Sequence, residues 1–265
     1  MSHRAPRSSL FMLSYFSKTS RLGRVNTGSV AQRLADTPGV ARTILGAARA
    51  ARGMPGADPR AMSHSWLFTG PPGSGRSLAA LDFAAALMCT DPEEPGCGRC
   101  EACQAVLGAK QHTDLVLVDP QEVIIPVDTV REVIGRAASL PTVAPWRVVI
   151  FNNADRLTNN GANALLKTVE EPPARTVIIM CAPSDAPEDF SQTLRSRCRH
   201  LYIPSPSVES ITAQLVSEGA SDHDAHLAAL TSLRHVGRAR RLVNDPAVQK
   251  RRAVAINLAE EVFHG

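Results

Sequence analysis

The amino-acid sequence predicts an α/β protein with a parallel sheet, followed by a small all-α unit. Three observations support this prediction. Short, nearly continuous apolar runs alternate with helical patterns, as expected for strands that crossover helices bury on both faces. A glycine-rich turn at 70–77 stands between one apolar run and a helical stretch. After a proline- and serine-rich linker at 204–207, only helical patterns follow.

Composition indicates a globular protein rather than a disordered or membrane-spanning one. The chain has 265 residues, 44% of them hydrophobic, which is enough for one large domain and a smaller unit. No apolar run approaches the ~18 residues that a spanning helix requires. The net charge of +4 permits a nucleic-acid partner without establishing one.

The predicted elements follow one another in the order that a wound sheet requires. Residues 1–35 contain no acidic side chain and little apolar periodicity, which indicates a disordered extension or a misassigned start; a transit peptide is the alternative. Strands are expected at 66–68, 114–119, 146–151 and 176–181. Helices are expected at 40–51, 78–88, 127–140, 208–216, 222–233, 237–243 and 247–262.

The turn at 70–77 has the spacing of a phosphate-binding loop. In the pattern G-x-x-x-x-G-K-[ST], backbone N–H groups and the N-terminus of the next helix converge on an anion. Every position fits except that of the lysine, which is Arg76. A planar guanidinium does not reproduce the compact charge of an ammonium between two phosphates, so ATP binding is doubtful. The candidate nucleotide-binding residues are Gly70, Pro71, Pro72, Gly73, Ser74, Gly75, Arg76 and Ser77.

Four of the six cysteines lie within residues 89–103. Two-residue spacers let successive thiolates reach one ion, and tetrahedral zinc takes four soft ligands. Nothing in the sequence suggests a secreted protein, so a disulfide framework is less favoured; redox-active or incidental thiols remain alternatives. With four cysteines the site has no open position for water, which indicates structural zinc. The expected ligands are Cys89, Cys97, Cys100 and Cys103, whereas Cys181 and Cys198 are interpreted as ordinary buried thiols.

A second feature argues against ATP hydrolysis. The strand at 146–151 runs into Asn152 and Asn153, where P-loop ATPases place acidic residues for Mg²⁺ and the attacking water. An amide carries no charge for a metal and cannot act as a general base. Asp155 lies two residues further on, and we expect it to cap the turn before a helix at Thr158. Together with Arg76, these residues predict a site that does not hydrolyse ATP.

Two later segments resemble the AAA+ clamp-loader family. The run 152–173, with its Ala-Leu-Leu-Lys and Glu-Glu-Pro-Pro sequences, looks like the segment that follows the Walker B strand. Residues 193–198 resemble the family's Ser-Arg-Cys motif. With the four-cysteine insertion, the chain resembles the delta-prime subunits of bacterial DNA polymerase III from about 40 to 252. The resemblance implies an AAA+ P-loop domain at 36–203, with its zinc module at 89–103, and a helical lid with the start of a truncated C-terminal region at 204–265.

The resemblance also implies a role in DNA replication. Delta-prime subunits are stators of the clamp loader, which places the sliding clamp on primer–template DNA within a DNA-directed DNA polymerase (nucleotidyltransferase) complex. The implied partners are the gamma/tau ATPase subunits, the delta subunit, and the clamp and DNA through the complex, with no membrane. The implied location is the cytoplasm, at the nucleoid-associated replisome. Such subunits generally do not hydrolyse ATP, but their Ser-Arg-Cys arginine acts on ATP bound by a neighbour. Arg197 matches that position.

Three further positions compare less closely with the family's ATP site. Arg238 loosely matches its second sensor arginine, and a solvated or interface charge is the alternative. At the position where the family's active subunits place a polar residue, called the first sensor, this chain has no such residue, or only Ser184. Lys167 is interpreted as an exposed helical lysine, with DNA or a neighbouring subunit as the alternative contact.

Two alternatives to the stator hypothesis follow from the same residues. The family continues beyond the lid into a helical collar domain, whereas this chain stops at Gly265; we therefore expect a truncated, non-functional fragment or weakened ring assembly. The other alternative is an active DNA-dependent AAA+ ATPase in which Arg76 replaces the lysine. The missing acidic pair after the strand at 146–151 distinguishes the stator from the active ATPase.

Overall fold

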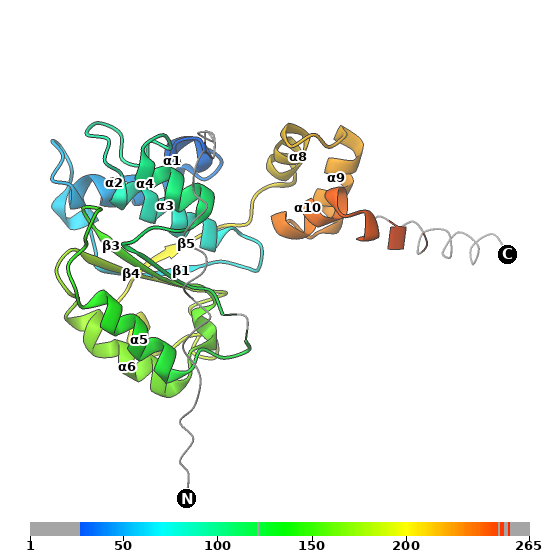
Figure 1. Ribbon diagram of the computed structural model, residues 1–265. Coiled ribbons are helices and arrows are strands. Elements are labelled where there is room, and N and C mark those ends of the chain that lie inside the picture. Colours follow the sequence, from blue (N-terminus) through cyan, green and yellow to red (C-terminus); the bar gives the residue numbers. More distant parts are fainter. Residues whose placement is uncertain (1–26, 121, 249, 252–253, 255–265) are drawn as a thin grey trace, which may run out of the picture.

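In the computed structural model, the residues described are 27–120, 122–248, 250–251 and 254. A five-stranded parallel sheet lies between two layers of helices, and a helical lid stands beside it (Figure 1). The strand order is β2-β3-β4-β1-β5. The strands are β1 (Ser65–Thr69), β2 (Leu115–Val118), β3 (Arg147–Phe151), β4 (Thr176–Ala182) and β5 (Arg199–Tyr202). The predicted α/β fold with a parallel sheet is confirmed.

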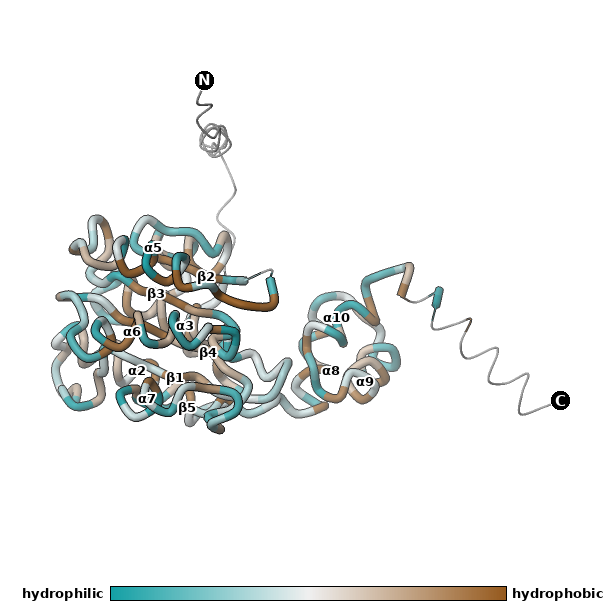
Figure 2. Tube along the Cα trace, turned by 90° about the horizontal axis from the view of Figure 1, so that it is seen from below, coloured by the Kyte–Doolittle hydropathy of each residue, from teal (hydrophilic) through white to brown (hydrophobic). Residues whose placement is uncertain are grey.

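Helices cover both faces of this sheet, as parallel strands require. The four helices α1 to α4 lie on one face, and α5 and α6 lie on the other (Figure 1). The central strands β1, β3 and β4 are buried at every position. In Figure 2 the strands follow one another in the order β2, β3, β4, β1 and β5. The bounds of these helices are Val30–Arg33, Pro38–Ala51, Arg76–Met88, Glu101–Gln104, Val127–Ala137 and Asn159–Glu170.

The core under α3 is built by aromatic rings from β1. The ring of Trp66 meets Phe83 at 5.1 Å and 76°, an edge-on contact that complements the ring quadrupoles. Phe68 stacks on the same Phe83 at 6.2 Å. Because α3 is alanine-rich and buried along most of its length, the helix packs close to the sheet. This packing fixes the glycine-rich turn that joins β1 to α3.

Several element boundaries differ from the expectations by one to three residues, and one strand was not expected at all. Helix α2 begins at Pro38, because proline is favoured in the first helical turn. Helix α5 ends at Ala137 rather than at residue 140. Strand β5 alternates between half-buried and exposed positions, so it lacks the continuous apolar run by which the other strands were recognised.

The segment before α2 is part of the folded domain, so the extension expected at 1–35 does not reach residue 35. Helix α1 begins after Ser29, whose hydroxyl and backbone form a capping box with Gln32. The Thr27 hydroxyl donates to the Gly98 carbonyl at 2.9 Å, and the Val30 N–H donates to the Gly96 carbonyl at 2.8 Å. We call residues 27–36 the N-terminal strap. Residues 1–26 lie outside the part of the chain that is described.

The strap is also joined to the helix behind the glycine-rich turn. Arg33 Nε donates to Asp82 Oδ1 at 2.5 Å, and the Asp82 side chain is 3% exposed. Burial raises the pKa of Asp82, and the charge and hydrogen bond of Arg33 oppose this effect. A carboxylate buried at this depth requires such a partner. Arg33 therefore ties the strap to α3.

The lid has its own apolar core. The linker at 204–207 leads from β5 to α8 (Val208–Ser217), α9 (Asp222–Thr231) and α10 (Val236–Asn244), whose apolar side chains form a separate cluster. All three match expected helices within two residues at each end, whereas most of the helix expected at 247–262 lies outside the described residues. None of the helices that the described residues form is long and apolar enough to cross a bilayer.

Candidate functional site

The glycine-rich turn closes around its own arginine. Arg76, the first residue of α3, donates from Nη1 to the Gly70 carbonyl at 2.9 Å and to the Pro71 carbonyl at 3.3 Å. Its Nη2 reaches Asn153 Oδ1 at 3.5 Å. A lysine here would direct its ammonium toward bound phosphates. The charge that should meet a nucleotide is instead engaged by the loop carbonyls and by the end of β3.

The lid also meets this turn. A Cβ added to Gly73, where φ is 87°, would lie 2.4 Å from Cγ of His235 and 2.7 Å from its Cα. Only glycine permits this close approach between the glycine-rich turn and the start of α10. Burial lowers the pKa of His235, and the nearby charges of Arg238, Arg241 and Arg76 lower it further. A neutral imidazole therefore covers the loop at Gly73.

The end of β3 presents amides to this region. Asn152 is buried and donates from Nδ2 to Asp119 Oδ1 at 3.3 Å. Asn153 has a φ of 51°, in the left-handed region that asparagine tolerates better than most residues. Two hydrogen-bonded pairs, Asn152 with Asp119 and Asn153 with Arg76, therefore lie at the carboxyl ends of β2 and β3.

Asp155 does not have the capping role expected of it. Thr158 caps α6 instead, since its Oγ1 accepts from the Gly161 N–H at 3.1 Å. Asp155 is exposed within the short 3₁₀ turn Ala154–Arg156. The hydroxyl of Ser184, the candidate first sensor, donates to Asp189 at 2.5 Å within its own loop.

The remaining predicted side chains occupy ordinary positions. Cys181 is buried and Cys198 is half-buried, and burial raises the pKa of each thiol to about 12. Their interpretation as ordinary thiols agrees with this burial. Arg238 and Lys167 are exposed.

The four clustered cysteines converge on one point. Their Sγ atoms all lie within 4.8 Å of one another, and none forms a disulfide. Cys89 follows α3, Cys100 caps α4, and Cys103 lies in that short helix. A tetrahedron with metal–sulfur bonds of ~2.3 Å separates its sulfurs by ~3.8 Å, which is the distance between Cys89 and Cys100 Sγ. The residues Cys89, Cys97, Cys100 and Cys103 therefore fit a tetrahedral metal ion.

Backbone amides support thiolates at this cluster. The N–H groups of Asp91, Cys100 and Cys103 each donate to a preceding sulfur at 3.4 Å. Hydrogen bonds to the charged form favour ionisation. The Cys103 thiol and backbone amides lower the pKa of Cys89, whereas its contact with Cys89 raises the pKa of Cys103. Burial also raises the pKa of Cys97, so the apo cluster favours the thiolate at Cys89 and the thiol at Cys97 and Cys103.

The candidate trans-acting arginine lies on a separate surface. Arg197 follows α7 (Gln192–Arg195), and its Nε donates to Glu170 Oε1 at 2.5 Å. Its Nη1 donates to the Thr193 carbonyl at 2.8 Å. The side chain is 37% exposed. The ion pair with Glu170 was not predicted, because no local pattern relates the end of α6 to the turn after α7.

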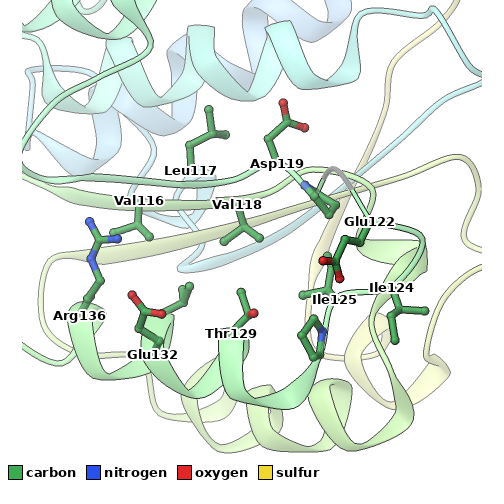
Figure 3. Close-up of a pocket in the computed structure, with 13 residues that line it drawn as sticks. Val116, Leu117, Val118, Asp119, Glu122, Ile124, Ile125, Thr129, Glu132 and Arg136 are labelled. Atoms are coloured by element: carbon green, nitrogen blue, oxygen red, sulfur yellow. The ribbon is translucent and has the colours of Figure 1, made fainter. Parts of the chain in front are cut away.

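A groove beside the edge strand β2 shares Asp119 with the hydrogen-bonded pair Asn152–Asp119. It has a volume of about 490 Å³ and lies between β2, the loop after it and α5. Figure 3 shows Val116 and Val118 directed toward α5, with Leu117 and Asp119 on the opposite side of the strand. The phosphate loop, the cysteine cluster and Arg197 contribute nothing to its lining.

Comparison with known proteins places this chain in a family. Residues 57–207 match the family described as "DNA polymerase III, delta subunit". The DNA polymerase III subunit delta' of Pseudomonas aeruginosa is 36% identical over 60% of this chain and 49% of that protein. The corresponding Escherichia coli K12 protein is 35% identical over 63% and 50%. DNA polymerase III subunit gamma/tau of Mycobacterium bovis is 34% identical over 63% and 30%.

The chain spans about half the length of the curated delta' relatives that it matches. The family match covers more than half of the 265 residues, and it includes the glycine-rich turn, the cysteine cluster and Arg197. The chain therefore belongs to the DNA polymerase III, delta subunit family and is a delta'-like clamp-loader subunit.

Proposed function

We propose that this chain is the stator of a DNA polymerase III clamp loader and hydrolyses no ATP itself. Its partners would be gamma/tau-type ATPase subunits and a delta subunit, which together load the sliding clamp onto primer–template DNA. It would work at the cytoplasmic replisome, within a nucleotidyltransferase complex. Family membership supports the replication role.

The engagement of Arg76 by its own loop carries the stator proposal. Its guanidinium donates to the Gly70 and Pro71 carbonyls, so it is directed toward its own loop rather than toward a β- or γ-phosphate. The amides at Asn152 and Asn153 supply neither a metal ligand charge nor a general base. Without these groups the turn can be retained as a structural joint between β1, α3 and the lid.

Arg197 would act on ATP held by the neighbouring subunit. It is exposed, and it comes from the segment that resembles the family's Ser-Arg-Cys motif. A guanidinium presented in trans offsets the charge that spreads over the γ-phosphoryl oxygens in the transition state. The chain would thus contribute one charged group to a reaction whose nucleotide and metal belong to its partner.

The four cysteines would hold a structural zinc ion. Four thiolates at tetrahedral spacing are the ligand set that zinc prefers in closed sites. When bound, the ion would cross-link the end of α3 to α4. Cys89, Cys97, Cys100 and Cys103 would each supply one sulfur, and the backbone amides would orient three of them.

Reconstitution tests the stator proposal. The chain is mixed with gamma/tau-type and delta subunits, and ATP hydrolysis stimulated by clamp and primed DNA is measured. We expect Arg197→Ala to lower turnover about 10²-fold or more, as for other arginine fingers, with assembly on size exclusion unchanged. Arg131→Ala is the control, since Arg131 is another exposed arginine paired with a carboxylate.

Two results would contradict the proposal. Hydrolysis by the isolated chain would show that Arg76 and Asn153 do not disable the site. Full stimulated turnover by Arg197→Ala in an assembled complex would remove the role in trans.

A further inference from the structure

The Arg197 guanidinium is held by three acceptors of its own chain. Nε donates to Glu170 Oε1 at 2.5 Å, and Nη1 donates to the Thr193 carbonyl at 2.8 Å and to Ser196 Oγ at 3.2 Å. The carboxylate and the carbonyl therefore bind two different nitrogens of one planar group. A planar fork that is fixed at two nitrogens has its third nitrogen oriented as well.

The third nitrogen is the one left for a partner. Nη2 of Arg197 makes no hydrogen bond within the part of the chain that the structure describes. The side chains of Arg197 and Glu170 are 37% and 47% exposed. The pair therefore lies at the surface, with Nε and Nη1 directed toward its own chain and Nη2 unpaired.

Both supports of this arginine are anchored in the core. Glu170 is the last residue of α6, and Val169 and Leu165 of that helix are buried. Helix α7 packs against α6, and its Leu194 is fully buried. The Arg197 N–H bonds the Leu194 carbonyl at 3.0 Å. The carboxylate and the carbonyl that bind the guanidinium thus come from two helices that pack against each other.

We propose that Glu170 is a positioning residue for Arg197, holding its guanidinium so that Nη2 faces the nucleotide phosphates of a neighbouring subunit. This inference rests on the proposed role of Arg197 in trans. Glu170 itself touches neither nucleotide nor metal. Its effect comes from ordering a long side chain before the reaction, so that less freedom is lost when the transition state forms.

The contacts indicate that Glu170 orients Arg197 rather than withholding its charge from a partner's phosphate. A carboxylate that sequestered the arginine would bind Nε and Nη2 together, the side-on bidentate arrangement that Glu218 makes with Arg240. Here the carboxylate takes Nε, which leaves Nη2 available. An exposed ion pair is also weak, so Glu170 does not withhold the charge from a phosphate.

The test compares Glu170→Gln with Glu171→Gln in the reconstituted complex. Both variants remove one negative charge, but only Glu170 contacts Arg197. We expect Glu170→Gln to lower kcat for stimulated ATP hydrolysis by about three- to tenfold, with KM for ATP unchanged and Glu171→Gln at the wild-type rate. In an Arg197→Ala background, Glu170→Gln should have no further effect.

A measurement on the isolated full chain provides the second readout. The Nε–H of Arg197 should give an ordered, slowly exchanging ¹⁵N-NMR signal in wild type and in Glu171→Gln, and should lose this order in Glu170→Gln. If Arg197→Ala lowers turnover but Glu170→Gln leaves or raises it, positioning is wrong while the stator proposal stands. If Arg197→Ala has no effect, the role in trans and this inference both fail.

Discussion

At the scale of single residues, the buried carboxylate of Asp114 shows how the domain fixes a loop with charge. Its oxygens accept from the N–H groups of Thr142, Val143 and Ala144 at 2.7–2.9 Å and from Arg147 Nη2 at 2.9 Å. Burial alone would raise its pKa, but these four donors lower the pKa of Asp114 to about 2. The carboxylate thereby orders the loop between α5 and β3.

Replacing Asp114 should weaken the fold more than replacing a surface acid does. Because Arg147 would be left buried without its counter-ion, we expect Asp114→Asn to lower the free energy of unfolding by about 3–5 kcal/mol. Urea denaturation measures this change. Asp128→Asn is the control, since Asp128 pairs with Arg131 at the surface. A loss below about 1 kcal/mol, the range of exposed pairs, would contradict the role assigned to Asp114.

The same carboxylate predicts a pH dependence. Its pKa is about 2 in the folded chain and near its ordinary value of ~3.9 when unfolded. The stabilisation is therefore complete above pH ~4 and is lost as the pH falls toward 2. Asp114→Asn should flatten this part of the stability curve relative to wild type.

At the scale of elements, the cysteine cluster and the N-terminal strap form one unit. A Cβ added to Gly98, where φ is 72°, would lie 2.0 Å from the Gly28 carbonyl oxygen. This contact leaves no room for any other residue, so the cysteine loop is shaped to receive the strap. Since the strap also pairs Arg33 with Asp82 of α3, loss of order in the cysteine loop would spread to the helix behind the phosphate loop.

Removing the proposed zinc should release the strap. We expect about one zinc per chain in the purified protein, and its loss in Cys97→Ser with a melting temperature lower by roughly 10 °C or more. Hydrogen exchange at the Val30 amide, which is bonded to Gly96, should accelerate. Cys181→Ala is the control and should keep the metal. Unchanged zinc content in Cys97→Ser would exclude that sulfur as a ligand.

At the scale of the whole molecule, two contacts hold the lid against the domain. His235 packs on Gly73 at the phosphate loop. The Ser210 hydroxyl of α8 donates to Asp36 in the strap. Both contacts join residues of this chain directly, so they help to fix the position of the lid. This suits a subunit whose proposed role is to stay fixed while its partners turn over ATP.

Acidification should loosen the lid. The pKa of His235 is below its ordinary value because of burial and the charges of Arg238, Arg241 and Arg76. Arg238 and Arg241 belong to α10 itself, so it is the burial of the ring and the charge of Arg76 that disfavour a proton in the docked state. Docking therefore weakens as the pH falls below ~6.5. Proteolysis at the linker 204–207 should be faster at pH 5.5 than at pH 7.5.

The variant His235→Asn separates this effect from general acid loosening. Asparagine keeps a side-chain acceptor for the Arg238 N–H, which caps α10, but it does not titrate. The rate of linker cleavage in this variant should therefore not rise between pH 7.5 and pH 5.5 as it does in wild type. The same acid acceleration in His235→Asn as in wild type would show that another group controls the lid.

The sequence alone determined the features whose signal is local in the chain. Four of the five strands are apolar runs of a few residues, the phosphate loop is a fixed spacing, and the four cysteines lie within residues 89–103. Fold class, candidate nucleotide residues and candidate metal ligands could therefore be named from periodicity and spacing. The edge strand β5 was not predicted, because its side chains alternate between half-buried and exposed positions and so form no continuous apolar run.

Only the tertiary structure decided which distant residues meet. Glu170 and Arg197 are 27 residues apart, Thr27 and Gly98 are 71 apart, and Asp36 and Ser210 are 174 apart. No local pattern encodes such pairs, because they arise from the packing of whole helices on a sheet. For this reason the positioning of Arg197, the strap over the cysteine loop and the seat of His235 on Gly73 became visible only in the folded chain.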